Sequence, residues 1–121
     1  MGIDIYAKWR GQTDKEKKAQ YTGFSAVAGS VGYLREAYSR SPFATRFFVA
    51  EAFIDGADDV KIPAEVLRSR LPETLKLVAE RYKEHDAEEI KEYQKAYEDF
   101  VELCEKKEKE TGEAVDIMAS Y

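Results

Sequence analysis

The sequence contains only one cysteine, Cys104, and only one histidine, His85. A single cysteine excludes an intramolecular disulfide and with it the class of small disulfide-stabilised domains. One cysteine and one histidine are also too few for a standard zinc or haem ligand set. Cys104 falls on the apolar face of a predicted helix, so we expect it to be buried and unreactive, because burial raises the pKa of a thiol.

Long hydrophobic runs are also absent. No stretch approaches the roughly 18 apolar residues that a membrane span requires, and residues 1–18 lack the apolar centre of a signal peptide. The 121 residues are 44% hydrophobic and 36% charged, which is sufficient for one compact core. We therefore expect a single domain over residues 1–121, soluble, intracellular and cytoplasmic, with no membrane partner. The net charge of −5 argues against a nucleic-acid partner.

Catalytic and cofactor motifs are scarce as well. Neither the G-x-G-x-x-G nor the G-K-[ST] nucleotide fingerprint occurs, and His85 has no serine or cysteine predicted near it for a catalytic triad. The acidic stretch with Glu51, Asp55, Asp58 and Asp59 lacks the ligand order of an EF-hand and is interpreted as a surface turn. We expect no metal and no cofactor, and the balance favours a protein without catalysis.

Apolar and polar residues alternate at both ends of the chain. This period-two pattern over residues 3–9 and 113–121 predicts two half-buried strands, which we expect to pair in one sheet. Thr13 and Glu16 have the spacing of a capping box and predict a short helix. The apolar run 45–53 fits a strand or a helix equally well, and both interpretations stay open.

The stretch 62–111 predicts two helices joined by a short turn. Pro63 and Pro72 each suit the first position of a helix, where the missing amide proton costs nothing. Asp86 followed by Glu89 predicts the start of the last helix. The expected fold is therefore α+β: a small antiparallel sheet that includes the N- and C-terminal strands, packed against a long antiparallel helical hairpin.

The segment 23–48 differs from the rest of the chain because it contains a single acid, Glu36. Its glycines, which we interpret as turns and as points of close packing, are Gly23, Gly29 and Gly32. Ser30 is suited to cap a helix, and residues 31–38 would form that helix.

Arginine and hydroxyl side chains gather in this same segment. Guanidinium forks and tyrosine hydroxyls bind phosphate and other anions well when they converge. The candidate ligand-binding residues are Tyr33, Arg35, Tyr38, Arg40 and Arg46. In the alternative interpretation Arg35 pairs locally, Arg40 is solvated and the tyrosines belong to the core.

The helical hairpin is the most acidic part of the sequence. Residues 73–113 carry 14 acidic and 8 basic side chains, and Tyr93 and Tyr97 are candidate interface residues on the last helix. These features favour a non-catalytic protein-interaction module whose partner is another protein or a second copy, giving a homodimer. The alternative is a protein, or an enzyme, that binds a small anion or nucleotide through residues 23–48.

Overall fold

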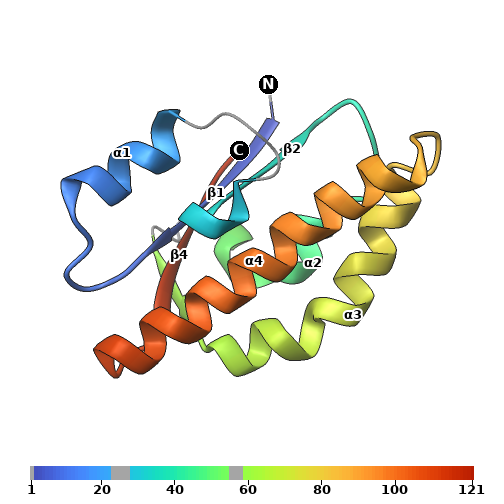
Figure 1. Ribbon diagram of the computed structural model, residues 1–121. Coiled ribbons are helices and arrows are strands. Elements are labelled where there is room, and N and C mark those ends of the chain that lie inside the picture. The colour runs from blue at the N-terminus through green and yellow to red at the C-terminus, as the bar shows by residue number, and fades with distance from the viewer. Residues whose placement is uncertain (1, 23–27, 55–58) are drawn as a thin grey trace.

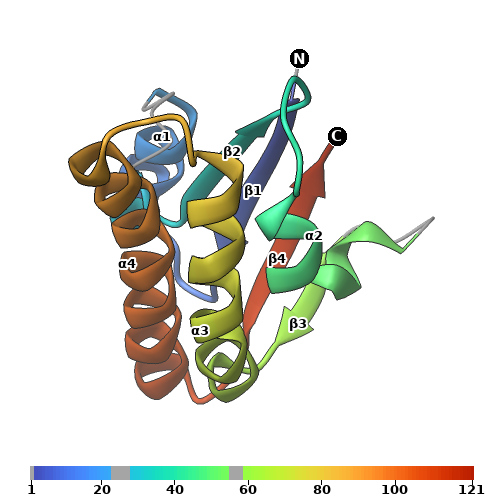
Figure 2. The ribbon, with the colours of Figure 1, turned by 90° about the vertical axis from the view of Figure 1, so that its right-hand side faces the viewer.

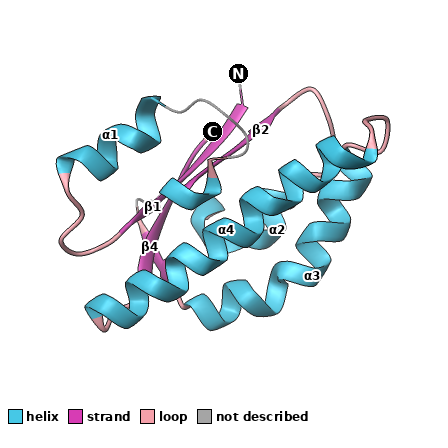
Figure 3. Cartoon of the chain, in the orientation of Figure 1, coloured by secondary structure: helices cyan, strands magenta, loops and turns pink. Residues whose placement is uncertain are grey.

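The computed structural model describes residues 2–22, 28–54 and 59–121, and it contains a four-stranded antiparallel sheet (Figures 1 and 3). Its strands are β1 (Gly2–Lys8), β2 (Tyr33–Ala37), β3 (Val60–Ile62) and β4 (Val115–Ser120), in the order β2-β1-β4-β3. The strand from each end of the chain lies at the centre, where Asp4 is paired with Ser120. The prediction that the two terminal strands pair is confirmed.

The helices α3 (Ala64–Arg81) and α4 (Ala87–Thr111) form the second layer. The other helical elements are α1 (Asp14–Thr22), α2 (Ala44–Phe48) and the 3₁₀ turns η1 (Gly29–Val31) and η2 (Ala50–Phe53). Figure 2 shows α3 and α4 side by side against one face of the sheet, which confirms the predicted α+β architecture. Over the described ranges, none of these helices is both long and apolar enough to cross a membrane.

The core lies between the sheet and the helical hairpin. Ile3, Ile5 and Ala7 of β1 are fully buried, because alternate residues of a strand face the same side. The ring of Phe48 from α2 lies edge-on to Tyr97 and Phe100 of α4, at centroid distances of 5.3 and 5.8 Å. Residues 45–53, for which the sequence allowed either a strand or a helix, are therefore helical. Phe48 in this segment places its ring in the core.

The predicted helix starts are confirmed by their hydrogen bonds. The backbone amide of Thr13 donates to Glu16 Oε1 at 2.9 Å, and the amide of Glu16 donates to Thr13 Oγ1 at 3.1 Å. Asp86 Oδ1 likewise accepts from the amide of Glu89 at 2.9 Å. Each cap satisfies amides that a helix leaves without partners in its first turn.

Two predictions about prolines are wrong. Pro63 is the N-cap of α3 and not its first residue, and Pro72 lies inside the same helix and does not start a new one. A proline in a helix interior removes one hydrogen bond and bends the helix, and α3 changes direction along its length in Figure 1. The helix continues because Leu71 and Val78, on either side of the bend, are both buried against the core.

The predicted helix over residues 31–38 is also wrong, since residues 33–37 form strand β2 and Ser30 lies within η1. Five consecutive pairs join β2 to β1, from Tyr33 opposite Tyr6 to Ala37 opposite Gly2. Pairing with a central strand outweighs the local helix preference of this segment, as is common for strand residues.

Two of the three predicted packing glycines have a visible reason. A Cβ atom on Gly29 would lie 1.7 Å from the carbonyl oxygen of Ala96, so η1 approaches α4 more closely than any side chain permits. Gly32 has φ +86°, a left-handed conformation that favours glycine. Both observations confirm the interpretation of these glycines, whereas Gly23 lies outside the described residues.

Candidate functional site

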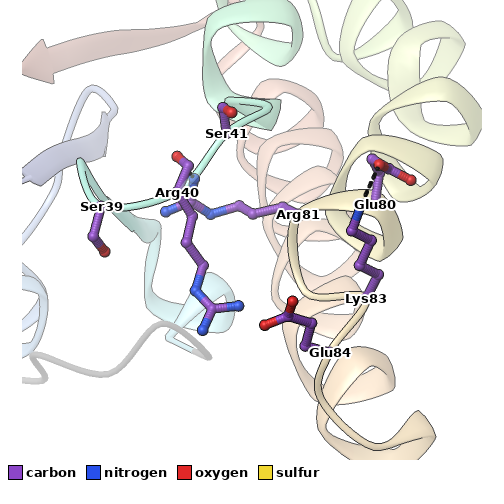
Figure 4. Close-up of a pocket in the computed structure, with 7 residues that line it drawn as sticks. All are labelled: Ser39, Arg40, Ser41, Glu80, Arg81, Lys83 and Glu84. Atoms are coloured by element: carbon purple, nitrogen blue, oxygen red, sulfur yellow. Dashed lines mark hydrogen bonds and ion pairs between the residues drawn. The ribbon is translucent and has the colours of Figure 1, made fainter.

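The loop between β2 and α2 faces the turn between α3 and α4, and two adjoining cavities of about 340 and 320 Å³ lie between them. We call the two together the loop–turn cleft, because both are lined by Ser39, Arg40 and Arg81. The first cavity, drawn in Figure 4, is also lined by Ser41, Glu80, Lys83 and Glu84. The second is also lined by Arg35, Ala37, Tyr82, His85 and Tyr93.

Arg81 holds the loop side of the cleft in place. It is the last residue of α3 and only 3% exposed, and Figure 4 shows its side chain crossing to the loop. Its guanidinium donates to the carbonyl oxygens of Ala37 at 2.6 Å, Arg40 at 2.5 Å and Pro42 at 3.4 Å. Several hydrogen bonds from one planar group fix the backbone that presents Ser39 and Arg40.

The charge of Arg81 is balanced by Glu36, which is 1% exposed. Arg81 Nε lies 3.7 Å from Glu36 Oε2. The same carboxylate accepts the backbone amides of Ala44 and Thr45, each at 2.9 Å, and the hydroxyl of Thr45. Glu36 thus joins β2, the start of α2 and the end of α3, and so fixes three elements around the cleft.

Arg40 differs from Arg81 because its guanidinium has no carboxylate within ion-pair distance in the described part of the chain. Figure 4 shows its side chain between the loop and the turn, on the same side as Glu84. Lys83 is paired with Glu80 at 3.3 Å. Among the cations of the first cavity, Arg40 therefore has the charge that remains available to a ligand.

Aromatic rings form the other wall of the cleft. Tyr82 and Tyr93 are stacked with centroids 3.9 Å apart and planes 9° from parallel. His85 lies edge-on to Tyr82 at 5.3 Å, and its Nδ1 is 2.6 Å from Glu89 Oε2. Burial raises the pKa of Tyr93, and the nearby charge of Arg40 opposes this shift. The positive charge of Arg40 is therefore felt in the second cavity as well as in the first.

Two of the five predicted ligand-binding residues, Arg35 and Arg40, line the cleft, and Tyr93 from the predicted interface lines it too. Arg35 donates to Asp4 Oδ1 at 2.7 Å, so its charge is partly neutralised by the neighbouring strand. Tyr33 is fully buried and donates to the same oxygen at 2.6 Å. Burial, followed by this hydrogen bond, raises the pKa of Tyr33 to about 12.

The remaining predicted site residues lie elsewhere. Tyr38 is 40% exposed and lines neither cavity of the cleft. Arg46 is also outside them, and its guanidinium lies 4.9 Å from the ring centroid of Phe53. Tyr97 is 4% exposed and belongs to the core, where burial and the charge of Glu36 raise its pKa well above the usual value.

The acidic turn and Cys104 are the two remaining candidates from the sequence. Asp55 and Asp58 lie outside the described residues, and Glu51 forms a bidentate pair with Arg70 at 2.7 and 2.8 Å, which lowers its pKa. Cys104 is fully buried, and burial raises the pKa of its thiol, as predicted.

Sequence reasoning missed the part of the cleft that comes from the helical hairpin. Arg81, Tyr82 and Lys83 form an ordinary helix end in the sequence, and only the fold brings them to residues 35–41. The usable signal was the short turn containing His85, because such turns place both helix ends beside one another.

Comparison of this chain with models of protein families, with curated proteins and with solved structures finds no match. Its function is therefore inferred from the geometry of the cleft.

Proposed function

We propose that this protein binds a small anionic molecule in the loop–turn cleft. The observation that carries the proposal is Arg40, an arginine without an acid partner in the described residues, at the junction of two cavities. Ser39 and Ser41, its neighbours in the loop, line the first cavity together with it (Figure 4). The two cavities are open to solvent, and the volume of each lies at the lower end of the range for small-molecule sites. Arginine is the side chain best suited to phosphate.

The proposal predicts that inorganic phosphate binds the wild-type protein and raises its melting temperature, because a ligand of the folded state stabilises it. Replacing Arg40 with alanine should weaken phosphate binding about tenfold or more, since a hydrogen bond to a charged group contributes about 1.5–3 kcal/mol. Glu84→Gln should strengthen binding, because it removes a negative charge from the same cavity. Isothermal titration calorimetry at low salt measures both changes.

Arg46→Ala is the matched control, since it removes the same charge from the same segment but lies outside the cleft. Its phosphate affinity should equal that of the wild type. The proposal fails if phosphate, sulfate and pyrophosphate all leave the melting temperature unchanged at millimolar concentration, or if Arg40→Ala and Arg46→Ala behave alike.

A protein-interaction function is the second candidate, and a different surface favours it. The guanidinium of Arg46 lies within 5.6 Å of the ring centroids of Phe43, Phe53 and Tyr121, and we call these four residues the α2 aromatic cluster. Tyr121 is 53% exposed, and Phe47, which lies on α2 beside Arg46, is 40% exposed. Exposed aromatic residues with arginine are typical of interface centres, so we propose that two copies associate here.

Native mass spectrometry tests this second proposal. The wild type should contain a dimer at micromolar concentration, and Tyr121→Ser should shift the population to monomer. Tyr38→Ser removes a comparably exposed ring from another surface and should leave the dimer intact. A monomeric wild type, or a Tyr121→Ser dimer of unchanged strength, contradicts this proposal.

A further inference from the structure

The two cavities of the loop–turn cleft have different chemical linings. The first contains the hydroxyls of Ser39 and Ser41 together with charged side chains. The second contains the rings of Tyr82, His85 and Tyr93. Because Arg40 lines both, a ligand held by its guanidinium has a polar compartment on one side and an aromatic compartment on the other.

The aromatic compartment contains an ordered stack. One face of Tyr82 is covered by Tyr93 at 3.9 Å, and the guanidinium of Arg81 lies over the Tyr82 ring at 5.3 Å. His85 lies edge-on to Tyr93 at 6.1 Å, with the planes 87° apart, so it does not stack on that ring. Among the described residues no ring is stacked on the other face of Tyr93, so that face is where a further planar ring would extend the stack, as bases do on aromatic side chains.

We propose that the ligand is a phosphate monoester whose organic part contains a planar ring. Its phosphate would lie at the guanidinium of Arg40, and its ring would stack on Tyr93. A nucleoside monophosphate and an aryl phosphate share this chemistry. The inference rests on the proposed anion-binding function and specifies which class of anion the cleft selects.

Calorimetry on the full chain with two matched ligand pairs tests this selection. Adenosine monophosphate is compared with ribose 5-phosphate, and phenyl phosphate is compared with methyl phosphate. Stacking of one ring contributes about 1–3 kcal/mol, so the ring-bearing member of at least one pair should bind about tenfold more tightly. A gain in the first pair alone identifies a nucleotide, and a gain in the second alone identifies an aryl phosphate.

Tyr93→Leu provides the variant test, because leucine keeps an apolar side chain at a partly buried position but has no ring. It should remove the tenfold gain, so that the ring-bearing and ringless members of each pair bind with similar affinity. Tyr38→Leu, outside the cleft, should retain the gain. If Tyr93→Leu weakens all four ligands equally, the residue acts through the fold and the inference is overturned.

The ligand series separates this inference from the proposed function without any variant. If all four ligands bind with equal affinity and Arg40→Ala weakens them, the anion site stands and the selection for a planar ring is wrong. If none of the four binds, the proposed function and this inference both fail.

Discussion

Replacing Arg81 with methionine should lower the free energy of unfolding by about 3–5 kcal/mol. Methionine fills much of the volume but leaves the carboxylate of Glu36 buried without a cation. Breaking a buried ion pair from one side is strongly destabilising, because the remaining charge keeps its desolvation cost. The carbonyl oxygens that Arg81 binds in the loop also lose their donor. Urea unfolding followed by circular dichroism measures the change.

Arg68→Met is the matched control for this prediction. Arg68 also lies on α3 and donates to Glu105 of α4 at 2.6 Å, but the two side chains are 48% and 41% exposed. An exposed pair contributes about 0–1 kcal/mol, so this variant should differ little from the wild type. Equal costs for Arg81→Met and Arg68→Met would contradict the role given to the buried pair.

Gly29→Ala should be the most damaging substitution that adds only one methyl group. The added Cβ would lie 1.7 Å from the carbonyl oxygen of Ala96 and 2.6 Å from its carbonyl carbon, so η1 and α4 must separate. Overpacking of this kind costs about 1–3 kcal/mol of folding stability and occasionally more. Because the obstacle is main chain and cannot move aside as a side chain can, we expect a loss of about 3 kcal/mol. The midpoint of urea unfolding should fall accordingly.

Two comparisons isolate the cause of that loss. Gly112→Ala adds a methyl group where no atom lies within 4 Å, and only its φ of +76° opposes it, so roughly 1–2 kcal/mol is expected. Adding Ala96→Gly to Gly29→Ala should give no recovery, because the obstacle is the main chain of residue 96. Recovery in that double variant would show that a side-chain contact, and not the backbone approach, sets the cost.

The parts of the fold that could be predicted from the sequence are those that local patterns determine. Alternation identified β1 and β4, and the side chains of Thr13 and Asp86 identified two helix starts, because each signal acts within a few residues. Strand β2 was predicted as a helix because its identity depends on pairing with β1, which is distant in sequence. Pro72 was predicted to start a helix for a similar reason. The burial of side chains along α3 stabilises the helix more than the one hydrogen bond lost at Pro72 destabilises it.

The candidate site followed the same division. Sequence composition pointed to Arg35 and Arg40 in one segment, and both line the cleft. Arg46 belongs to the same composition signal but lies among Phe43, Phe53 and Tyr121, where no local pattern would have placed it. The role of Arg81 could not be predicted from the sequence, because it depends on three carbonyl oxygens of a loop about 40 residues earlier in the chain.

The central position of β1 and β4 determines when this sheet can be assembled during synthesis. Strand β1 pairs along one edge with β4, as Asp4 does with Ser120, so that edge waits until residues 115–120 have emerged. Strand β3 pairs only with β4 among the described residues and must wait equally long. Until then the open edge of β1 can pair with other chains, so crowding of nascent chains is the condition under which misassembly should be greatest.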